Sequence, residues 1–275
     1  NNTTLNATYV PTTSEINNGS LTLTLTTTGN GTCDAATDQI LITFTPAPTA
    51  NAGSDVSVCA NNPTVTLNGV VTVATGGTWT GGTGSYNPGA NALATQYTPS
   101  AAEISSGSVT LTLTTTGNGN CNAVSDNILI SFTPAPTANA GTDQTKCKNN
   151  AVTTLAGAIT VATGATWSGG TGLFSPNNNT LNATYTPSAS ELANGFVNLT
   201  LTTTGNGNCN AVNDQMTITF TDAPIVDAGI DQTVCANNAN VSLNGTVVGA
   251  TGGQWTSSGT GTFSPNNNTL NATYI

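Results

Sequence analysis

The sequence has no histidine and almost no basic residues. It holds two lysines and no arginine against 12 acidic residues, which gives a formal net charge of -10. The two lysines, Lys146 and Lys148, flank Cys147. Binding of nucleic-acid phosphates needs clustered basic side chains, so we expect no nucleic-acid partner. Acid–base catalysis would depend on isolated carboxylates, so we expect a protein that is not an enzyme, with no catalytic residues and no cofactor.

Charged residues of both signs are scarce, and long apolar runs are missing. Charged residues make up 5% of the chain, where globular proteins usually have about 25%, and threonine and asparagine take their place. We find no run that could span a membrane and no signal peptide, so we expect any targeting or anchoring segment to lie outside residues 1–275. The six cysteines without any histidine indicate disulfides in an oxidising compartment and no metal site. The sequence therefore predicts an extracellular, cell-surface protein.

A unit of 88 residues repeats along the whole chain. The period separates three sets of equivalent residues: Cys59, Cys147 and Cys235; Cys33, Cys121 and Cys209; and Trp79, Trp167 and Trp255. The chain begins and ends inside a unit, because its opening NNTTLNATY matches the NNNTLNATY that ends at Tyr185. Copying one domain end to end is typical of spacer and display proteins.

Each unit has the pattern of an all-β domain. LTLTLTTTG alternates leucine with threonine, as in Leu21, Leu23 and Leu25, and this alternation buries one face of a strand. A second alternating strand follows a Gly-Asn-Gly turn, which predicts a hairpin. About seven short strands with a tryptophan in the middle are typical of an immunoglobulin-like sandwich. We expect tandem immunoglobulin-like β-sandwich domains, arranged end to end as an extended filament, with these core residues: Trp79, Trp167, Trp255, Tyr97 and Tyr185.

One helical turn recurs in every unit. Ser100 and Glu103 have the spacing of a capping box, in which hydroxyl and carboxylate satisfy the free amides of a helix start. The same pair returns as Thr12 with Glu15 and as Ser188 with Glu191. A catalytic acid is the alternative role for these glutamates, and we favour the cap.

Proline-rich linkers mark the unit boundaries. The segment TPAPTANAG favours extended geometry, because proline cannot donate to a strand ladder. We predict four domains: the C-terminal half of a repeat at 1–46, complete repeats at 47–134 and 135–222, and the N-terminal part of a repeat at 223–275.

Several strings resemble a known family. AGSDVSVC, GGTWTGGTG, TLNATYTPSASEL, TTTGNGNC and the closing ITFTDAP or ISFTPAP are similar to the immunoglobulin-like or PKD-like repeats of the giant gliding-motility surface adhesins of Bacteroidetes (SprB-like). The resemblance covers essentially the whole chain. It implies type IX export to the outer membrane, display as a filament, coupling to gliding machinery at the cell surface, and adhesion to an external surface or polysaccharide through other parts of the parent chain. We also expect the filaments to associate laterally with one another.

The cysteines allow two sets of disulfides. Pairing inside a repeat joins Cys59 to Cys121 and Cys147 to Cys209, and leaves Cys33 and Cys235 to partners outside residues 1–275. The rival set crosses the repeat boundary: Cys33 with Cys59, Cys121 with Cys147, and Cys209 with Cys235. In an end-to-end stack the rival set would require the chain to double back after the linker. We therefore favour the pairs inside a repeat, each stabilising by roughly 4 kcal/mol in the loop-entropy model.

Aspartates also recur with the period. One set follows Ala-Gly-x (Asp55, Asp143 and Asp231), and the other precedes the last strand (Asp38, Asp126 and Asp214). A calcium site near the unit boundary would use such carboxylates. The sequence shows no EF-hand spacing and no clustering, so we favour turn or strand capping over metal binding.

Three classes of function remain. A structural and adhesive shaft fits interchangeable units and an uncharged surface. A carbohydrate-binding module would need exposed aromatic residues, for which Tyr86 and Phe174 near a glycine-rich loop are candidates. An ice-binding adhesin would need several adjacent rows of threonine, whereas each unit has one strong TLTLT strand. We therefore expect a passive shaft, with recognition elsewhere in the parent chain.

Overall fold

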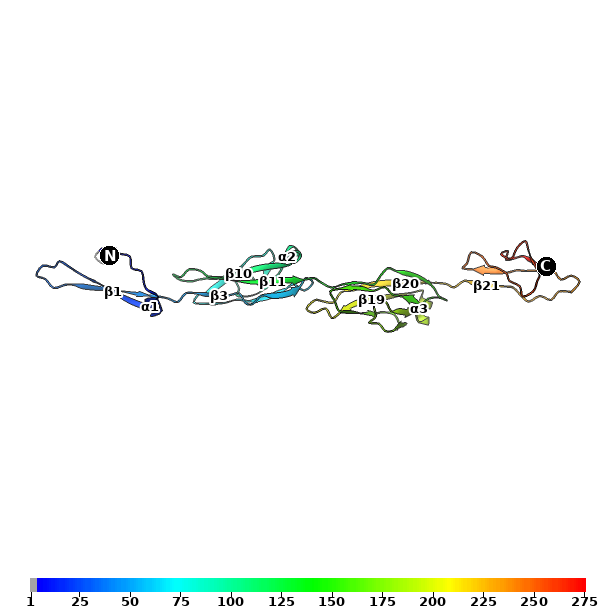
Figure 1. Cartoon of the computed structure of the whole chain (residues 1–275), viewed down its shortest axis with the longest axis horizontal. Coiled ribbons are helices and arrows are strands. Elements are labelled where there is room, and N and C mark those ends of the chain that lie inside the picture. Colours follow the sequence, from blue (N-terminus) through cyan, green and yellow to red (C-terminus); the bar gives the residue numbers. More distant parts are fainter. Residues whose placement is uncertain (1–3) are drawn as a thin grey trace. The chain divides into compact units, whose positions relative to one another are not determined.

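The computed structural model describes residues 4–275 (Figure 1). They divide into two compact units, Asn1–Ala135 and Pro136–Ile275. The domain boundaries that the sequence indicates after residues 46, 134 and 222 stay predictions. In residues 4–275, no helix combines the length and the apolar character needed to cross a membrane.

Residues 47–134 form an all-β sandwich. Its main sheet has the strand order β4-β11-β10-β7, and two smaller sheets have the orders β5-β9-β8 and β3-β6. The elements are β3 (Thr49–Asn51), β4 (Val56–Cys59), β5 (Val65–Asn68), β6 (Val70–Thr72), β7 (Gly76–Thr80), β8 (Ser85–Asn87), β9 (Ala94–Thr98), α2 (Ala101–Ser106), β10 (Ser108–Thr116) and β11 (Ser125–Thr133).

Residues 135–222 repeat this arrangement in the second unit. The main sheet has the order β13-β20-β19-β16, beside β14-β18-β17 and β12-β15. The elements are β12 (Thr137–Asn139), β13 (Gln144–Cys147), β14 (Thr153–Thr154), β15 (Ala158–Thr160), β16 (Gly164–Ser168), β17 (Leu173–Ser175), β18 (Thr184–Thr186), α3 (Ala189–Asn194), β19 (Phe196–Thr204) and β20 (Asn213–Thr221). The chain is thus a tandem array of immunoglobulin-like sandwiches.

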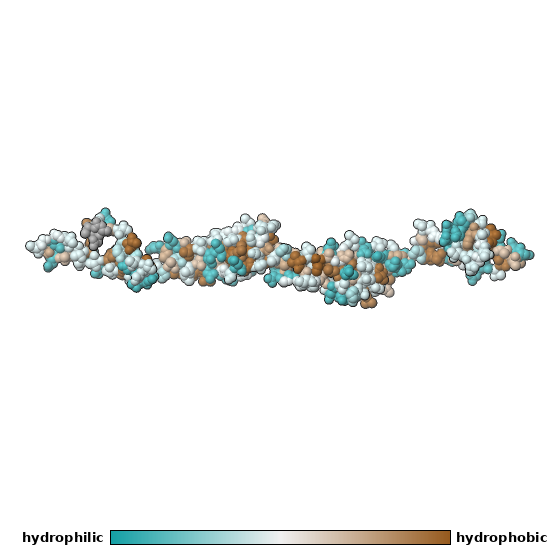
Figure 2. All heavy atoms as spheres, in the orientation of Figure 1, coloured by the Kyte–Doolittle hydropathy of each residue, from teal (hydrophilic) through white to brown (hydrophobic). Residues whose placement is uncertain are grey.

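The segments on either side are partial copies. The first holds α1 (Thr13–Asn17), β1 (Ser20–Thr26) and β2 (Thr37–Thr43). The last holds β21 (Ile225–Asp227), β22 (Val241–Ser242), β23 (Thr246–Val248), β24 (Phe263–Ser264) and β25 (Thr273–Tyr274). Figure 2 shows that pale and teal residues cover much of the visible surface, as the shortage of apolar and charged side chains would suggest.

The alternating pattern places one face of each long strand in the core. In the antiparallel hairpin β10–β11, Leu111 lies opposite Ile128, and the two are 0% and 4% exposed. Trp79 on β7 of the main sheet and Tyr97 on β9 of the sheet β5-β9-β8 pack in the same core. Fully burying such a side chain contributes about 1.5–3 kcal/mol, so this cluster provides much of the stability of the repeat.

The expected core residues are buried in the complete repeats but not in the last partial repeat. Trp79, Trp167, Tyr97 and Tyr185 are buried. Trp255 is half-buried, contrary to the prediction that it lies in a core. In the complete repeats the tryptophan strand pairs with a long strand, β10 or β19, and residues 223–275 contain no counterpart of that strand.

The second strand of each complete repeat is a parallel neighbour of its last strand. β4 pairs with β11 from Val56 opposite Ile130 to Cys59 opposite Thr133. β13 pairs with β20 in the same way. Since the two strands run in one direction, the chain enters a repeat at one end and leaves it at the opposite end.

The periodic aspartates bind backbone amides around this pair of strands. Asp126 accepts a hydrogen bond from the Ala52 N–H at 2.8 Å, and Asp55 accepts one from the Leu129 N–H at 2.9 Å. Asp214 and Asp143 do the same in the second complete repeat. Each repeat therefore has two side-chain links between its first segment and its last strand.

We expect the double variant Asp126→Ala/Asp214→Ala to lose about 1–3 kcal/mol of unfolding free energy in each complete repeat. The reason is that the Ala52 N–H, on a residue that is 1% exposed, would lose its acceptor. Urea unfolding of the whole chain, followed by tryptophan fluorescence, measures the change.

Asp38→Ala is the matched control. Asp38 occupies the equivalent position of residues 1–46, which contain no counterpart of Ala52, and it is exposed. Its removal should leave the unfolding curve almost unchanged. Equal losses in both variants would show that these aspartates act through general charge effects and not through the amide link.

Candidate functional site

The most distinctive recurring chemistry lies at the joint between repeats. In the first unit, a groove is lined by the end of α1, by the linker 45–48 and by the loop before β11, which carries Cys121. We call this the joint groove; its lining residues are Ile16, Asn17, Thr45, Pro46, Ala47, Pro48, Asn120, Cys121, Asn122 and Val124. It combines elements of the partial repeat 1–46 with a loop of the repeat 47–134.

Cys121 faces the linker directly. Its thiol donates to the Pro46 carbonyl at 3.7 Å, and its sulfur lies 3.4 Å from the Thr45 hydroxyl oxygen. The loop that carries it spans residues 117–124, with Gly117 and Gly119 in the left-handed region at φ 68° and 60°. Glycine tolerates this region, and the loop can therefore turn back to the linker.

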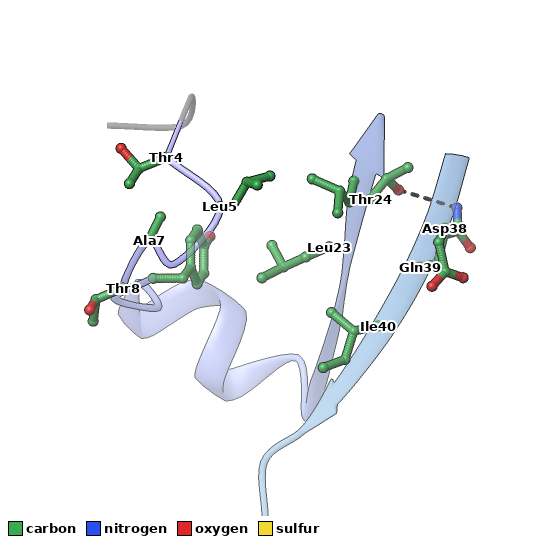
Figure 3. Close-up of a pocket in the computed structure, with 11 residues that line it drawn as sticks. Thr4, Leu5, Ala7, Thr8, Leu23, Thr24, Asp38, Gln39 and Ile40 are labelled. Atoms are coloured by element: carbon green, nitrogen blue, oxygen red, sulfur yellow. Dashed lines mark hydrogen bonds between the residues drawn. The ribbon is translucent and has the colours of Figure 1, made fainter. Parts of the chain in front are cut away.

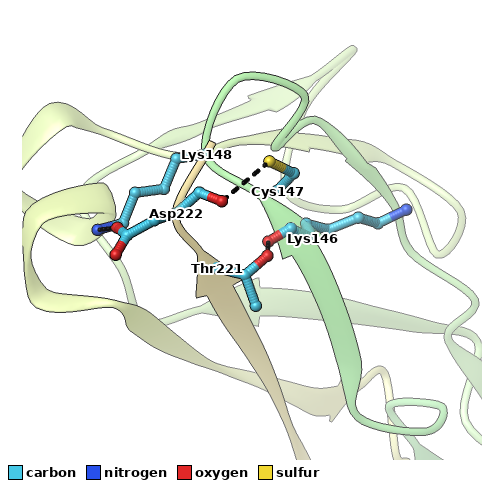
Figure 4. A network of polar contacts seen from close by, with 5 residues as sticks. All are labelled: Lys146, Cys147, Lys148, Thr221 and Asp222. Atoms are coloured by element: carbon cyan, nitrogen blue, oxygen red, sulfur yellow. Dashed lines mark hydrogen bonds and ion pairs between the residues drawn. The ribbon is translucent and has the colours of Figure 1, made fainter. Parts of the chain in front are cut away.

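Cys59 and Cys147 lie at the other end of their repeats. Cys59 ends β4, and its sulfur is 3.9 Å from the Pro134 carbonyl oxygen. Cys147 ends β13, and its thiol donates to the Asp222 carbonyl at 3.7 Å (Figure 4). We refer to Cys59 and Cys147 as the strand-end cysteines, and to Cys121 and Cys209 as the loop cysteines.

A surface ion pair accompanies the strand-end cysteine in the second unit. Lys148 binds the Asp222 carboxylate at 2.6 Å, and this hydrogen bond and charge lower the pKa of Asp222 (Figure 4). The Thr221 hydroxyl donates to the Lys146 carbonyl at 3.3 Å. Asp222 is exposed, so the pair adds little to stability.

The structure contradicts the cysteine pairing that we favoured. Cys121 and Cys147 are free thiols, as are Cys33 and Cys235. Cys59 and Cys209 are each disulfide-bonded. The bridges Cys59–Cys121 and Cys147–Cys209 are therefore absent, and the rival pairs Cys33–Cys59, Cys121–Cys147 and Cys209–Cys235 are absent as well.

The direction of β4 explains the error. Cys59 is the last residue of β4. It lies opposite Thr133 at the far end of β11, whereas Cys121 precedes the start of that nine-residue strand. At about 3.3 Å per residue, the two cysteines are more than 25 Å apart, while a disulfide needs Cα atoms within about 7 Å.

A buried tyrosine–glutamate pair connects the helical turn to the sandwich through hydrogen bonds. Tyr97 donates to the Glu103 carboxylate at 2.7 Å, and the same oxygen accepts the Thr83 N–H at 2.6 Å. The other carboxylate oxygen accepts the Ser100 N–H at 2.7 Å, so the predicted capping box is present. A Cβ at Gly82 would clash with the Tyr97 hydroxyl, which explains the glycine-rich loop here.

These contacts set the ionisation of the pair. Burial raises the pKa of Glu103, but hydrogen bonds from Ser100, Tyr97 and Thr83 outweigh it and hold that pKa below its usual value. Burial and the bond to Glu103 raise the pKa of Tyr97. Tyr185 and Glu191 repeat the arrangement. Both carboxylate oxygens of Glu103 and of Glu191 accept hydrogen bonds from the surrounding structure, so these residues cap the helical turns.

A second hollow, in the first partial repeat, is an uncovered core face. Leu23, Leu25 and Ile40 line it beside the segment 4–9 (Figure 3). Leu25 and Ile40 are 64% and 62% exposed, whereas their equivalents in the next repeat are buried at 0% and 4%. The partial repeat lacks the strands that cover these positions, so the hollow has the character of an open core and not of a ligand site.

Two further candidates from the sequence are a metal site and a sugar-stacking surface. In residues 4–275 no three acidic or cysteine side chains gather as a metal site. Tyr86 and Phe174, the candidates for sugar stacking, are half-buried and pack against Tyr97 and Tyr185 with ring centroids 4.8 Å apart. Burial raises the pKa of Tyr86 to about 12, and its hydroxyl donates to the Gly81 carbonyl.

The comparisons with known proteins found similarity to solved structures. No family model matches this sequence, and no curated protein matches it. A protocadherin gammaB7 EC3-6 cis-dimer structure has 12% identity and TM-score 0.38, covering 95% of this chain and 76% of that one. Mouse Cadherin-23 EC22-24 has 13% identity and TM-score 0.34, covering 83% and 88%. Sidekick-1 immunoglobulin domains 1–5 have 13% identity and TM-score 0.31, covering 82% and 52%. The fold assignment rests on the strand order and pairing described above.

We expect the double variant Glu103→Gln/Glu191→Gln to weaken the pH dependence of stability. The pKa of each glutamate is lowered by folding, so its contribution is complete above the unfolded pKa of about 4.3 and is lost as the pH falls through the lower folded pKa. At neutral pH the variant should lose roughly 1.5–3 kcal/mol per repeat, the usual contribution of a hydrogen bond to a charged group. Thermal unfolding between about pH 3 and 7 measures both effects.

Glu15→Gln provides the comparison for this test. Glu15 has the same capping box and the same tyrosine contact, to Tyr9, but lies in the partial repeat and lacks the loop amide that Thr83 donates to Glu103. Its substitution should change the curve less. An unchanged pH profile in the double variant would refute the role given to the buried glutamates.

Proposed function

We propose that this chain is a repeat segment of a giant cell-surface adhesin, in which it acts as a shaft that extends reach and transmits force. The parallel pairing of β4 with β11 supports this most directly. It brings the chain into a repeat at one end and out at the other, so each added copy adds length. Strands of nine residues at about 3.3 Å per residue, together with a linker, would add roughly 35–45 Å per repeat.

The same pairing suits a load-bearing role. Force applied along the chain would pull β4 and β11 in opposite directions along their common ladder, so the hydrogen bonds would be sheared together and not opened one at a time. The links from Asp55 to Leu129 and from Asp126 to Ala52 lie across the same two segments. A repeat of this design resists extension along its own axis.

The resemblance to giant Bacteroidetes adhesins supports the finer part of the proposal. On this view the parent protein is exported by the type IX route and displayed at the outer membrane, where gliding machinery moves it. Other parts of it bind an external surface or polysaccharide, and filaments associate laterally. The disulfide-bonded state of Cys59 and Cys209 fits an extracellular location, because such bonds persist in oxidising compartments.

The proposal is tested by deleting residues 47–222 in frame from the parent protein. This removes two whole periods and leaves the remaining repeats in phase. We expect cells that still bind the same surface or polysaccharide, with filaments shorter by roughly 70–90 Å, the length estimated for two repeats from the strand rise. Electron microscopy gives the length, and adhesion and gliding assays give the function.

Two results would contradict the shaft. One is a fragment of residues 47–222 that binds the polysaccharide as tightly as whole cells, because recognition would then lie in the repeats. The other is loss of adhesion in the deletion strain although the parent protein still reaches the surface in normal amount.

A further inference from the structure

Two valines have a backbone conformation that valine rarely adopts. Val73 and Val161 occupy the same position of the two complete repeats, and their φ angles of 64° and 65° lie in the left-handed region. The Ala74 N–H donates to the Thr72 carbonyl at 2.7 Å across the first valine, and the same bond closes the turn in the second repeat. A bond of this kind around a positive φ makes the rare, strained γ-turn, and a β-branched side chain adds to the strain. We call Val73 and Val161 the turn valines.

Glycine would form this turn without strain. The equivalent residue of the last partial repeat is Gly249, whose φ is 77°, and glycine adopts the left-handed region at no steric cost. The turn valines are 50% and 55% exposed, so burial in the core does not offset the strain. Strained residues persist where the surrounding structure favours them. The offsetting contact therefore lies at the surface of the repeat.

The strand register places a linker proline beside each turn valine. β3 and β6 are antiparallel, and their ladder ends with Thr49 opposite Thr72. The hydroxyl oxygens of these two threonines are 2.6 Å apart. The next pair beyond the ladder is Pro48 with Val73. β12 and β15 have the same register, which places Pro136 beside the second turn valine.

The last partial repeat shows what a side chain at this position would meet. A Cβ added at Gly249 would lie 3.5 Å from the Pro224 Cα, which is an ordinary van der Waals contact. Pro224 occupies the position of Pro48 and Pro136 in the period. Pro48 and Pro136 are buried, whereas Pro224, beside a glycine, is exposed.

The loop 117–120 is a second neighbour of the turn. It lines a hollow together with Val73, and the Gly117 carbonyl accepts the Thr75 N–H at 3.4 Å. Residues 223–275 contain no counterpart of this loop. The exposure of Pro224 thus has two sources, the missing side chain and the missing loop, and variants of the valine alone separate them.

We propose that Val73 and Val161 clamp the linker proline of their own repeat, Pro48 or Pro136, and that this contact offsets the strain of the γ-turn. Proline has no N–H to donate to a ladder, so an apolar side-chain contact is the means by which it is held. The clamp makes the proline part of the folded repeat and not of the free linker. In a shaft it would limit bending where the chain enters a repeat, but it does not depend on that role.

Hydrogen exchange of the whole chain, followed by mass spectrometry, tests the clamp. Val73→Ala removes two methyl groups and keeps the direction of the Cβ. We expect the protection factor of segment 49–52 to fall roughly three- to tenfold, since about half of the burial of two methyl groups is lost. Segment 137–140 of the other complete repeat is the internal reference and should not change. An unchanged protection factor in segment 49–52 would overturn the proposal.

Val70→Ala is the matched control. Val70 lies on β6, in the same two-stranded sheet, and is 57% exposed. Its substitution removes the same two methyl groups at a residue that does not adjoin the linker proline. The protection factor of segment 49–52 should fall less than in Val73→Ala. An equal fall would show that this sheet responds to the loss of any valine, and the clamp would be refuted.

A double-mutant cycle tests the contact itself. Pro48→Ala is combined with Val73→Ala, and the protection factor of segment 49–52 is compared among the four proteins. If the two side chains act through one contact, the double variant should resemble the weaker of the two single variants. Fold-losses that multiply would mean that Pro48 and Val73 act independently, which contradicts the clamp.

Val73→Gly separates the strain from the contact. Glycine and alanine both lose the clamp, but alanine retains the penalty of a positive φ. The urea midpoint of Val73→Gly, read from tryptophan fluorescence, should therefore be higher than that of Val73→Ala by roughly 0.3–0.5 M. A midpoint equal to or below that of Val73→Ala would show that the turn holds no strain at this residue and would overturn the proposal.

Discussion

The parallel pairing of β4 with β11 is the constraint on which the rest of the repeat depends. It fixes the two chain ends of the repeat at opposite poles, because Cys59 must lie opposite Thr133. The hairpin β10–β11 and the tryptophan strand β7 extend the same sheet. Because β4 and β11 run in the same direction, the chain enters the repeat at one end and leaves it at the other.

Polar side chains stabilise this arrangement in place of charge pairs. Asp126 supplies an acceptor to the buried Ala52 amide, and Glu103 joins the helical turn to Tyr97 and to the Thr83 loop. A buried carboxylate is costly unless donors surround it, and here three donors do so. Asp126 and Glu103 thus stand where a backbone amide or a tyrosine hydroxyl would otherwise lack a partner.

The strands and the helix caps could be predicted from the sequence. The direction of β4 beside β11 and the cysteine pairing that depends on it could not. The alternation of Leu111 and Leu113 with threonine, and the spacing of Ser100 and Glu103, depend on neighbours within a few residues, so strands and cap follow from pattern alone. The bond from Leu129 to Asp55 joins residues 74 positions apart. No periodicity indicates which direction β4 takes beside β11, and the cysteine pairing failed because that direction decides it. The prediction that Trp255 lies in a core was wrong for a related reason, because a residue at this position is buried only where the covering strand is present.

The sparse charge of the repeats makes their stability insensitive to salt. The ion pair of Lys148 with Asp222 is at the surface, where salt screens it over about 8–10 Å. The core around Trp79 and the bonds of Glu103 are buried and are screened far less. Their free energy therefore changes little with the ionic strength of the medium. A repeat stabilised by apolar burial, ladder hydrogen bonds and enclosed carboxylates keeps the same dimensions at low and at high ionic strength.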